Sequence, residues 1–295
     1  MKLVFIGCVE SSLRFVEEIY KNTSAEIVGI VTKTESAFNS DHVSLVDFAK
    51  KGGIDWHNFE SNDRMENWIK SKSPDLIYCF GWSHILPLSI CDIPKYGAVG
   101  YHPSLLPENR GRHPIVWALV LGLEKTGSTF FFLSNEADAG DILNQRIVEI
   151  KPTDDARILY NRLLEVGKEQ VVILTEDFIN NTIKPVKQDE MKANVWRKRS
   201  KKDGLIDWRM TTDSILRLIS ALSKPYVGAH AMYKGNEFVI WKAEEVKDLH
   251  FLYANIEPGK VIETSNDTFV VKTGNSLIKI LEHELDKSPK PGEYL

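Results

Sequence analysis

The chain has 295 residues, of which 43% are hydrophobic and 26% are charged, and its formal net charge at pH 7 is −4. This length accommodates two domains, and the composition is that of an ordinary globular protein. The acidic balance argues against a general binder of polyanions, and no apolar run approaches the ~18 residues of a membrane span. Three cysteines without metal-ligand spacing favour a reduced, cytoplasmic location.

Strand-like and helix-like segments alternate over residues 1–186, which we predict to form one domain. Short apolar runs predict strands at 2–8, 25–31, 75–80, 98–101, 129–133 and 147–150. Amphipathic stretches predict helices at 10–20, 44–51, 63–72, 114–121 and 154–181, the first with an inward stripe of Leu13, Phe15, Val16, Ile19 and Tyr20. Gly167 weakens the prediction that the last helix is unbroken. The alternation indicates an α/β fold with a Rossmann-like parallel sheet, but Gly7-Cys8-Val9-Glu10 lacks the dinucleotide fingerprint.

Residues 187–202 are polar and basic, without apolar periodicity, and we predict that they form a linker. The run 196–202 within them could be a tRNA patch, but a solvated linker is the favoured interpretation, because residues 203–295 carry eleven Lys/Arg against fourteen Asp/Glu. We predict that residues 203–295 form a small open β-barrel of the OB type, after one helix at 213–223. Its five strands are expected at 230–233, 237–242, 260–263, 268–272 and 276–281, with hairpin turns at 234–236 and 273–275.

His102 follows the apolar strand 98–101 and enters a loop bounded by prolines. A histidine at the carboxyl end of a buried strand lies where open α/β sheets bind their ligands. Asp138 lies in a second, glycine-containing loop after the strand 129–133. A nearby carboxylate favours the charged form of an imidazole, so we predict His102 and Asp138 as a proton-transfer pair.

The region around these two residues resembles the folate-dependent formyltransferases. The resemblance is carried by His-Pro-Ser-Leu-Leu-Pro at 102–107, Arg-Gly at 110–111, Pro114, Thr-Gly-Ser-Thr at 126–129 and Asp-x-Gly-Asp at 138–141. A second block, 202–208 with 217–229, extends the likeness into the carboxyl-terminal third. The family includes methionyl-tRNA formyltransferase, the glycinamide ribonucleotide enzyme and the sugar-nucleotide N-formyltransferases.

The resemblance implies transfer of a formyl group from 10-formyltetrahydrofolate to an amine, with His102 and Asp138 as catalytic residues and no metal. Residues expected at the folate are Phe80, Gly81, Trp82, Ile85, Leu86, Pro87, Asp138, Gly140 and Asp141. Residues expected at the acceptor are Glu10, Ser11, Ser104, Arg110, Arg112 and His113. Hydrogen bonding within the loop is an equal alternative for Arg110, and plain helix capping is the favoured role of Glu10 and Ser11.

Gly100 departs from the family pattern, which has an asparagine two positions before the histidine. Losing a donor to the developing oxyanion typically costs about 10²–10³ in rate. Tyr101, Ser104 or Asn109 could replace it, the chain could polarise the formyl group differently, or it could be an inactive relative that binds folate or a nucleotide. Because His102 and Asp138 are both present, we favour an active enzyme, with Gly100 making room for ligand or ordered water.

The acceptor predicted from the second block is a nucleotide-linked amino sugar, as in cell-surface polysaccharide biosynthesis. Methionyl-tRNA is the alternative acceptor, and the acidic carboxyl-terminal module counts against it because a tRNA-binding module should show a basic face. The expected partners are therefore folate and the sugar nucleotide, with no nucleic acid and no membrane. Dimers are common in the sugar-nucleotide branch, so the resemblance also implies a homodimer of this chain.

Overall fold

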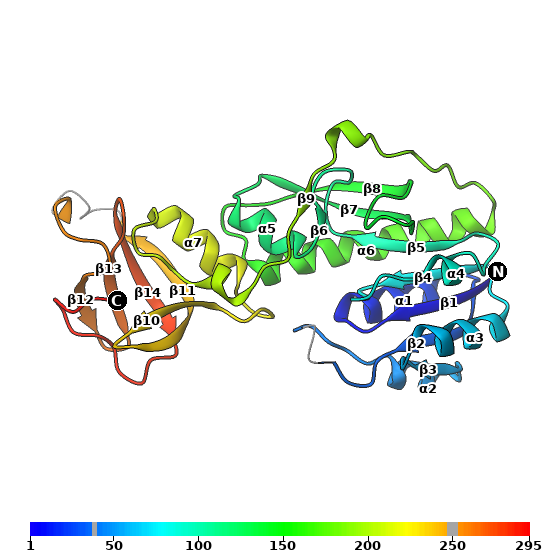
Figure 1. Ribbon diagram of the computed structural model, residues 1–295, viewed down its shortest axis with the longest axis horizontal. Helices are drawn as coiled ribbons and strands as arrows, with labels where there is room; N and C mark the ends of the chain where they lie inside the picture. Colours follow the sequence, from blue (N-terminus) through cyan, green and yellow to red (C-terminus); the bar gives the residue numbers. More distant parts are fainter. Residues whose placement is uncertain (37–39, 247–252) are drawn as a thin grey trace. The chain divides into compact units, whose positions relative to one another are not determined.

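The computed structural model describes residues 1–36, 40–246 and 253–295 (Figure 1). Its contacts divide the chain into two compact units. The first unit comprises Met1–Pro114, Lys125–Glu149 and Tyr160–Arg197, and the second comprises Ile115–Glu124, Ile150–Leu159 and Lys198–Leu295. Within the described residues, no helix combines the length and the apolar character that crossing a membrane requires.

A seven-stranded sheet in the order β3-β2-β1-β4-β5-β7-β8 forms the centre of the first unit (Figure 1). Its strands are β1 (Lys2–Gly7), β2 (Glu26–Thr32), β3 (Trp56–Asn58), β4 (Leu76–Phe80), β5 (Ala98–His102), β7 (Lys125–Phe132) and β8 (Ile142–Glu149). The strands from β3 to β5 are parallel, which confirms the α/β prediction. β7, however, runs antiparallel to both β5 and β8. The loop from β7 to β8 is too short for a parallel crossover, which accounts for the second of these pairings.

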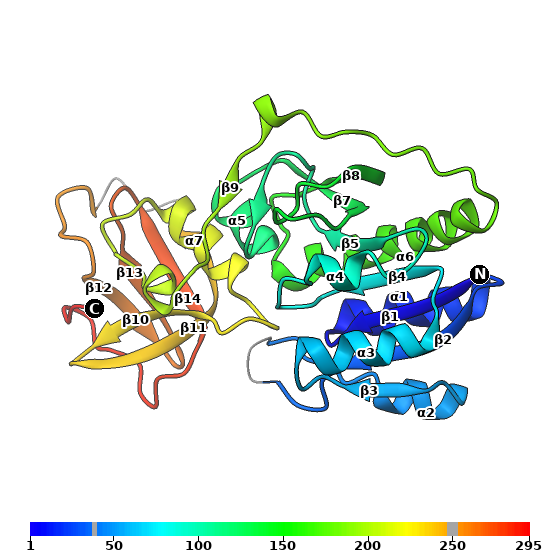
Figure 2. The ribbon, with the colours of Figure 1, turned by 45° about the vertical axis from the view of Figure 1, so that its right-hand side comes forward.

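Helices cover both faces of this sheet, as Figures 1 and 2 show from two directions. On one face lie α1 (Glu10–Asn22) and α6 (Ala156–Ile179). The Phe15 ring of α1 packs edge-on against Phe80 of β4, and the hydroxyls of Tyr78 and Thr175 are 3.0 Å apart. The helices α3 (Asn62–Lys72) and α4 (Leu88–Cys91) cover the other face with a buried apolar cluster, while α2 (Val46–Gly52) packs near α1 through the Tyr20–Phe48 ring contact.

Two helix predictions need correction. The helix α6 runs unbroken through Gly167. A Cβ at that position would lie only 2.6 Å from Cζ of Phe15. The glycine therefore serves close packing between α6 and α1 and does not interrupt the helix. Tyr20, predicted to point inward, is 50% exposed, because it lies at the edge of the apolar stripe against Phe48.

The second unit contains a five-stranded antiparallel sheet in the order β10-β11-β14-β13-β12. The strands are β10 (Ala229–Tyr233), β11 (Asn236–Val246), β12 (Val261–Ser265), β13 (Thr268–Lys272) and β14 (Leu277–His283), with α7 (Thr212–Ala221) before them. The turn between β10 and β11 uses Lys234 and Gly235 at φ 49° and 80°, the geometry of a two-residue hairpin. The predicted small antiparallel β domain is confirmed, and α5 (Pro114–Val120) falls almost wholly in the same unit.

The first part of the segment predicted as a linker is bound to the first unit. The strand β9 (Val195–Trp196) pairs in parallel with β6 (Arg110–Gly111), immediately after a short 3₁₀ turn at Glu190–Lys192. The contacts that hold this segment are made by polar side chains and backbone groups. Contacts of this kind do not require apolar residues at regular spacing, so the periodicity that predicts helices and strands could not indicate them.

Candidate active site

His102 is the last residue of β5, and its side chain is almost completely buried. Its Nε2 lies 2.9 Å from the carbonyl oxygen of Asn109. A carbonyl oxygen only accepts hydrogen bonds, so Nε2 carries the proton and donates it to Asn109. In the neutral ring, the lone pair that can accept a further proton is then on Nδ1.

Asp138 faces that nitrogen. Its Oδ2 lies 3.7 Å from Nδ1 of His102 and accepts a hydrogen bond of 2.8 Å from the backbone N–H of Gly111. The backbone of Asp138 adopts φ 59°, a left-handed conformation that aspartate tolerates better than most side chains. The structure therefore brings together the two residues that the sequence paired.

The route by which Asp138 reaches His102 differs from the prediction. Since β7 is antiparallel to β5, its carboxyl end lies beside Ala98, at the opposite end of β5 from His102. The loop 133–141 doubles back, and the N–H of Phe132 donates to the carbonyl of Asp141 at 2.9 Å. Gly140 allows this tight return, because a Cβ there would lie 1.8 Å from the carbonyl oxygen of Phe132.

The loop after β4 begins beside His102, because β4 and β5 are parallel neighbours that pair Cys79 with Gly100. Of the residues predicted to bind folate, Phe80 and Leu86 are buried in the core, while Ile85 is 72% exposed. Pro87 caps α4, and Gly81 has φ 62° with its Cα packed against Val9.

Trp82 of this loop packs in an aromatic and cationic environment. Its indole packs edge-on against Phe59 at 5.0 Å, and the ammonium group of Lys33 lies 5.1 Å from the indole centroid. The indole N–H is buried and, within the described part of the chain, lacks a hydrogen-bond partner. A buried donor without a partner is unfavourable by roughly 1–3 kcal/mol, so a ligand acceptor at this point would be stabilising.

The residues predicted at the acceptor occupy varied surroundings. Arg110 is buried in hydrogen bonds to Gln188 and Glu190, and the Glu190 carboxylate raises the pKa of the guanidinium. Arg112 is exposed and donates to the carbonyl of Ser83 at 3.3 Å, whereas Ser104 is buried and donates to the carbonyl of Glu108 at 3.0 Å. Of the remaining three predicted residues, His113 follows the His102 loop at φ 59°. Glu10 and Ser11 begin α1, where their N–H groups donate to the Asp41 carbonyl and the Tyr160 hydroxyl.

Sequence reasoning missed Gln188 and Asn194, which contact both loops of the candidate site. The amide of Gln188 donates to the carbonyls of Asp138 and Gly140 at 2.8 and 2.7 Å. The side-chain oxygen of Asn194 accepts from the N–H of Asn109 at 2.8 Å. Both residues lie in the polar segment interpreted as a linker, and no local motif marks them.

Burial favours the protonated form of two of the three cysteine thiols. Burial raises the pKa of Cys91 to about 11 and raises the pKa of Cys79 further. Protonated thiols are poor nucleophiles and poor metal ligands. Among the described residues, no group of three His, Cys, Asp or Glu side chains is placed to hold a metal ion.

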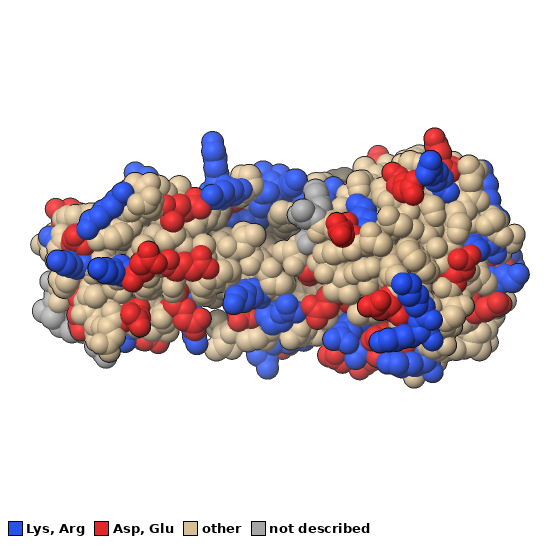
Figure 3. All heavy atoms as spheres, turned by 90° about the horizontal axis from the view of Figure 1, so that it is seen from below, with Lys and Arg blue, Asp and Glu red and all other residues tan. Residues whose placement is uncertain are grey.

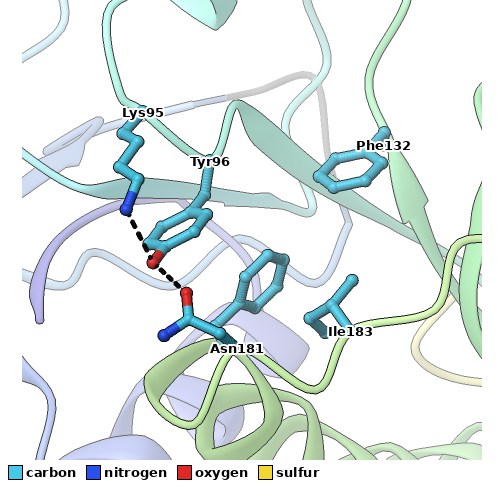
Figure 4. A pocket seen from close by; sticks show the side chains of 6 residues that line it. Lys95, Tyr96, Phe132, Asn181 and Ile183 are labelled. Atoms are coloured by element: carbon cyan, nitrogen blue, oxygen red, sulfur yellow. Dashed lines mark hydrogen bonds between the residues drawn. The ribbon is translucent and has the colours of Figure 1, made fainter.

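A separate pocket of 330 Å³ lies near the start of β5 and the end of β7 (Figure 4). It is lined by Lys95, Tyr96, Phe132, Phe178, Asn181 and Ile183. In it, the Tyr96 hydroxyl accepts from Lys95 at 3.1 Å and donates to the side-chain oxygen of Asn181 at 2.5 Å. Lys95 and Tyr96 precede β5 whereas His102 ends it, so this pocket is not part of the candidate site.

Comparison with known proteins shows the family of this chain. The family model described as formyl transferase matches residues 1–175, and the model of the formyl transferase C-terminal domain matches residues 198–293. The methionyl-tRNA formyltransferase of Caldanaerobacter subterraneus subsp. tengcongensis is 31% identical over 100% of this chain and 96% of its own length. The enzyme of the same name from Bacillus subtilis is 29% identical over 95% of this chain and 88% of its own length.

Two solved structures share the fold at lower identity. The N-formyltransferase of Helicobacter canadensis, in complex with folinic acid and dTDP-3-aminofucose, has a TM-score of 0.71 at 19% identity and covers 96% of this chain and 99% of its own. HypX from Aquifex aeolicus, in complex with tetrahydrofolic acid, has a TM-score of 0.71 at 20% identity. The match covers 97% of this chain and 44% of HypX.

Proposed function

Because this chain belongs to the formyl transferase family, we propose that it transfers a formyl group from 10-formyltetrahydrofolate to the amino group of methionyl-tRNA. The observation that carries this acceptor is the 31% identity with a methionyl-tRNA formyltransferase, which extends over the whole chain and includes the carboxyl-terminal domain. This order reverses the prediction from the sequence, which placed the nucleotide-linked amino sugar first.

His102 would accept the proton that the attacking amine loses. Its Nε2–H is engaged with the carbonyl of Asn109, so the proton goes to Nδ1. The imidazolium that forms would be stabilised by the Asp138 carboxylate 3.7 Å away, which is itself held by the N–H of Gly111. A general base positioned in this way contributes roughly 10²–10⁴ in rate.

Folate binding would use the loops on either side of His102. When bound, the donor supplies an electrophilic formyl carbon. The buried indole N–H of Trp82 would donate to a ring acceptor of the folate, and the loop 138–141 would form the opposite wall. Four of the five N–H groups of Arg110 donate to Gln188 and Glu190, so for Arg110 we favour the role within the loop and propose Arg112 as the cationic group for the acceptor.

One observation favours the second acceptor, a nucleotide-linked amino sugar. Residues 203–295 carry a net charge of −3, from eleven Lys/Arg and fourteen Asp/Glu. On the face drawn in Figure 3, the basic and acidic side chains are interspersed. A domain that binds tRNA is expected to concentrate basic charge along the phosphate path.

Two residues of the basic run before that domain make contacts inside the second unit. The guanidinium of Arg199 stacks on Trp117 at 4.7 Å and donates to the carbonyl of Asp203, and Lys201 pairs with Glu237 at 2.7 Å. Both contacts lie within the second unit, while the run 196–202 as a whole adds five Lys/Arg and no Asp/Glu to the charge of residues 203–295.

A direct comparison of acceptors tests the proposal. The protein would be incubated with 10-formyltetrahydrofolate and either methionyl-tRNA or a panel of nucleotide-linked amino sugars, and products read by mass for the gain of one formyl group. The His102→Ala variant serves as the matched control for background transfer. Formyl-methionyl-tRNA as the favoured product supports the proposal, while turnover of a sugar nucleotide with none of the tRNA overturns it in favour of the second acceptor.

A further inference from the structure

Gln188 connects the two loops of the candidate site through both ends of its side-chain amide. Its side chain is buried, and its nitrogen donates to the carbonyls of Asp138 and Gly140 at 2.8 and 2.7 Å. Its oxygen accepts from Nε and a terminal nitrogen of Arg110 at 3.2 and 2.8 Å. Both donor hydrogens and both acceptor positions of the amide are therefore used.

Arg110 is the neighbour in sequence of Gly111, the residue that binds the carboxylate of Asp138. The next residue in the chain, Gly111, donates its N–H to Asp138 Oδ2 at 2.8 Å. Gln188 thus fixes the backbone of Asp138, while Arg110 fixes the strand that presents the Gly111 N–H to the side chain. Glu190 completes the arrangement, since its carboxylate accepts two hydrogen bonds from Arg110 at 2.9 and 2.7 Å.

The same segment also holds the partner of His102. Asn194 accepts from the N–H of Asn109 at 2.8 Å, and its own amide donates to the Asn109 side chain at 3.2 Å. The N–H of Arg110 donates to the Asn194 carbonyl at 3.0 Å. The carbonyl of Asn109 is the group that fixes the proton on Nε2 of His102. The contacts of the segment 188–196 therefore reach both members of the predicted pair (Figure 1, β6 and β9).

From these contacts we infer that Gln188 is a positioning residue for formyl transfer, which sets the Asp138 loop against the His102 loop. The inference rests on the proposed use of His102 and Asp138 in catalysis. Asp138 sits in a left-handed conformation at a loop that doubles back, so local backbone preference does not hold it there. A displacement of about 1 Å at a catalytic group can cost on the order of 10² in rate.

Two substitutions separate the parts of this role. Gln188→Glu keeps the shape and the acceptor for Arg110 but cannot donate to the carbonyls of Asp138 and Gly140. Gln188→Met removes both functions. The matched control is Gln170→Glu in α6, because Gln170 is also buried and donates to the Ser128 carbonyl at 3.0 Å and to Asn144 at 2.7 Å. The same chemical change is thus made away from the two loops.

The first measurement needs no substrate. Hydrogen exchange read by mass spectrometry on peptides covering 133–141 should accelerate at least about fivefold in Gln188→Glu and in Gln188→Met, and should stay at the wild-type rate in Gln170→Glu. Unchanged exchange in both Gln188 variants overturns the inference. Because this arm involves no formyl transfer, its result stands whether or not an acceptor is identified, so failure of the inference and failure of the proposed function can be told apart.

The second measurement is kinetic, on the full chain with its formyl donor and best acceptor. We expect kcat to fall roughly 10- to 100-fold in Gln188→Glu with KM changed less than threefold, because the lost contacts position a reacting group. The loss should be far from additive with Asp138→Asn, because both changes act on one carboxylate. A kcat loss no larger than that of Gln170→Glu, or full additivity with Asp138→Asn, would show that Gln188 only stabilises the fold.

Discussion

The side chain of Leu133 occupies the space that a side chain at Gly100 would need. A Cβ built on Gly100 would lie 2.7 Å from Cδ2 of Leu133 and 3.0 Å from Cζ of Phe131. Apolar packing from β7 and the start of the Asp138 loop therefore fills the place of the asparagine found in the family pattern. The expectation that Gly100 makes room for ligand or water is wrong, because this space is taken by core side chains.

This packing predicts a specific pair of substitutions. Gly100→Asn alone should lower the free energy of unfolding by about 1–3 kcal/mol, because it overfills a packed region. In a Leu133→Ala background the same asparagine should be tolerated better, since the atom that it meets first is gone. Urea denaturation of the single and double variants measures this coupling, and additive losses would contradict it.

None of the three local donors considered from the sequence points freely into the site. The hydroxyl of Tyr101 accepts a hydrogen bond from Ser128 of β7, and the hydroxyl of Ser104 donates one to the Glu108 carbonyl. The side-chain oxygen of Asn109 accepts from the amide of Asn194 at 3.2 Å, which ties that side chain to the segment 188–196.

Removing either member of the predicted pair should abolish most of the activity. We expect His102→Ala and Asp138→Asn each to lower kcat by at least ~10² while the fold is retained. Asp138→Asn is the sharper variant, because asparagine keeps an acceptor for the Gly111 N–H but loses the negative charge that faces Nδ1. Circular dichroism checks the fold, and near-normal turnover in a folded variant removes that residue from the mechanism.

A substitution at Gly140 tests whether the tight return of the loop 133–141 is needed, without removing a polar side chain of the site. Gly140→Ala places a Cβ 1.8 Å from the carbonyl oxygen of Phe132, and a backbone atom cannot move aside as a flexible side chain can. The loop should be displaced, with stability lowered by about 1–3 kcal/mol and activity lost in parallel. Ala139→Gly in the same loop is the control. Wild-type activity in Gly140→Ala would mean that the tight return is not required.

The sequence predicted the parts of the fold that depend on apolar periodicity. The parallel strands β1, β2, β4 and β5, the helices α1, α2, α3 and α6 and two hairpins of the second unit follow from runs and turns that are local in the chain. The short elements β3 and α4 were not predicted, because three or four residues are too few to show a periodicity. His102 and Asp138 were found because His102 ends one apolar strand and Asp138 lies in the loop that follows another. Their meeting, however, depends on an antiparallel strand and a loop that returns, which no periodicity encodes.

The sequence did not predict the contacts that hold the site together. Gln188 and Asn194 act across 50 and 85 positions of sequence on the Asp138 and Asn109 loops. Hydrogen bonds between residues so far apart impose no regular spacing on the chain. The segment 187–202 was therefore predicted as a linker from its polar and basic composition. Leu133 was hidden for a similar reason, because its packing partner, Gly100, lies on a different strand.

The folate prediction is tested by ligand-induced stabilisation. A ligand that binds only the folded state stabilises by about 2.7 kcal/mol at a hundred times its Kd. Folinic acid should therefore raise the Tm by several degrees, and Trp82→Phe should reduce that rise, because phenylalanine keeps the ring contact with Phe59 but removes the buried N–H donor. No Tm rise in the wild type would exclude the folate assignment, and an equal rise in Trp82→Phe would remove only the indole from it.

The acid sensitivity of the fold should depend in part on His57. Its ring stacks on Trp68 with centroids 5.5 Å apart, and burial lowers the pKa of His57 below its usual value. The unfolded chain protonates His57 at its ordinary pKa of about 6.5, while the folded protein resists protonation until a lower pH. Between those two values the unfolded state binds more protons, so stability falls as the pH falls. The free energy of unfolding, measured from pH 8 to 5, should decline less steeply in His57→Phe, which keeps the stacking but cannot titrate. Parallel curves for the two proteins would show that His57 does not contribute.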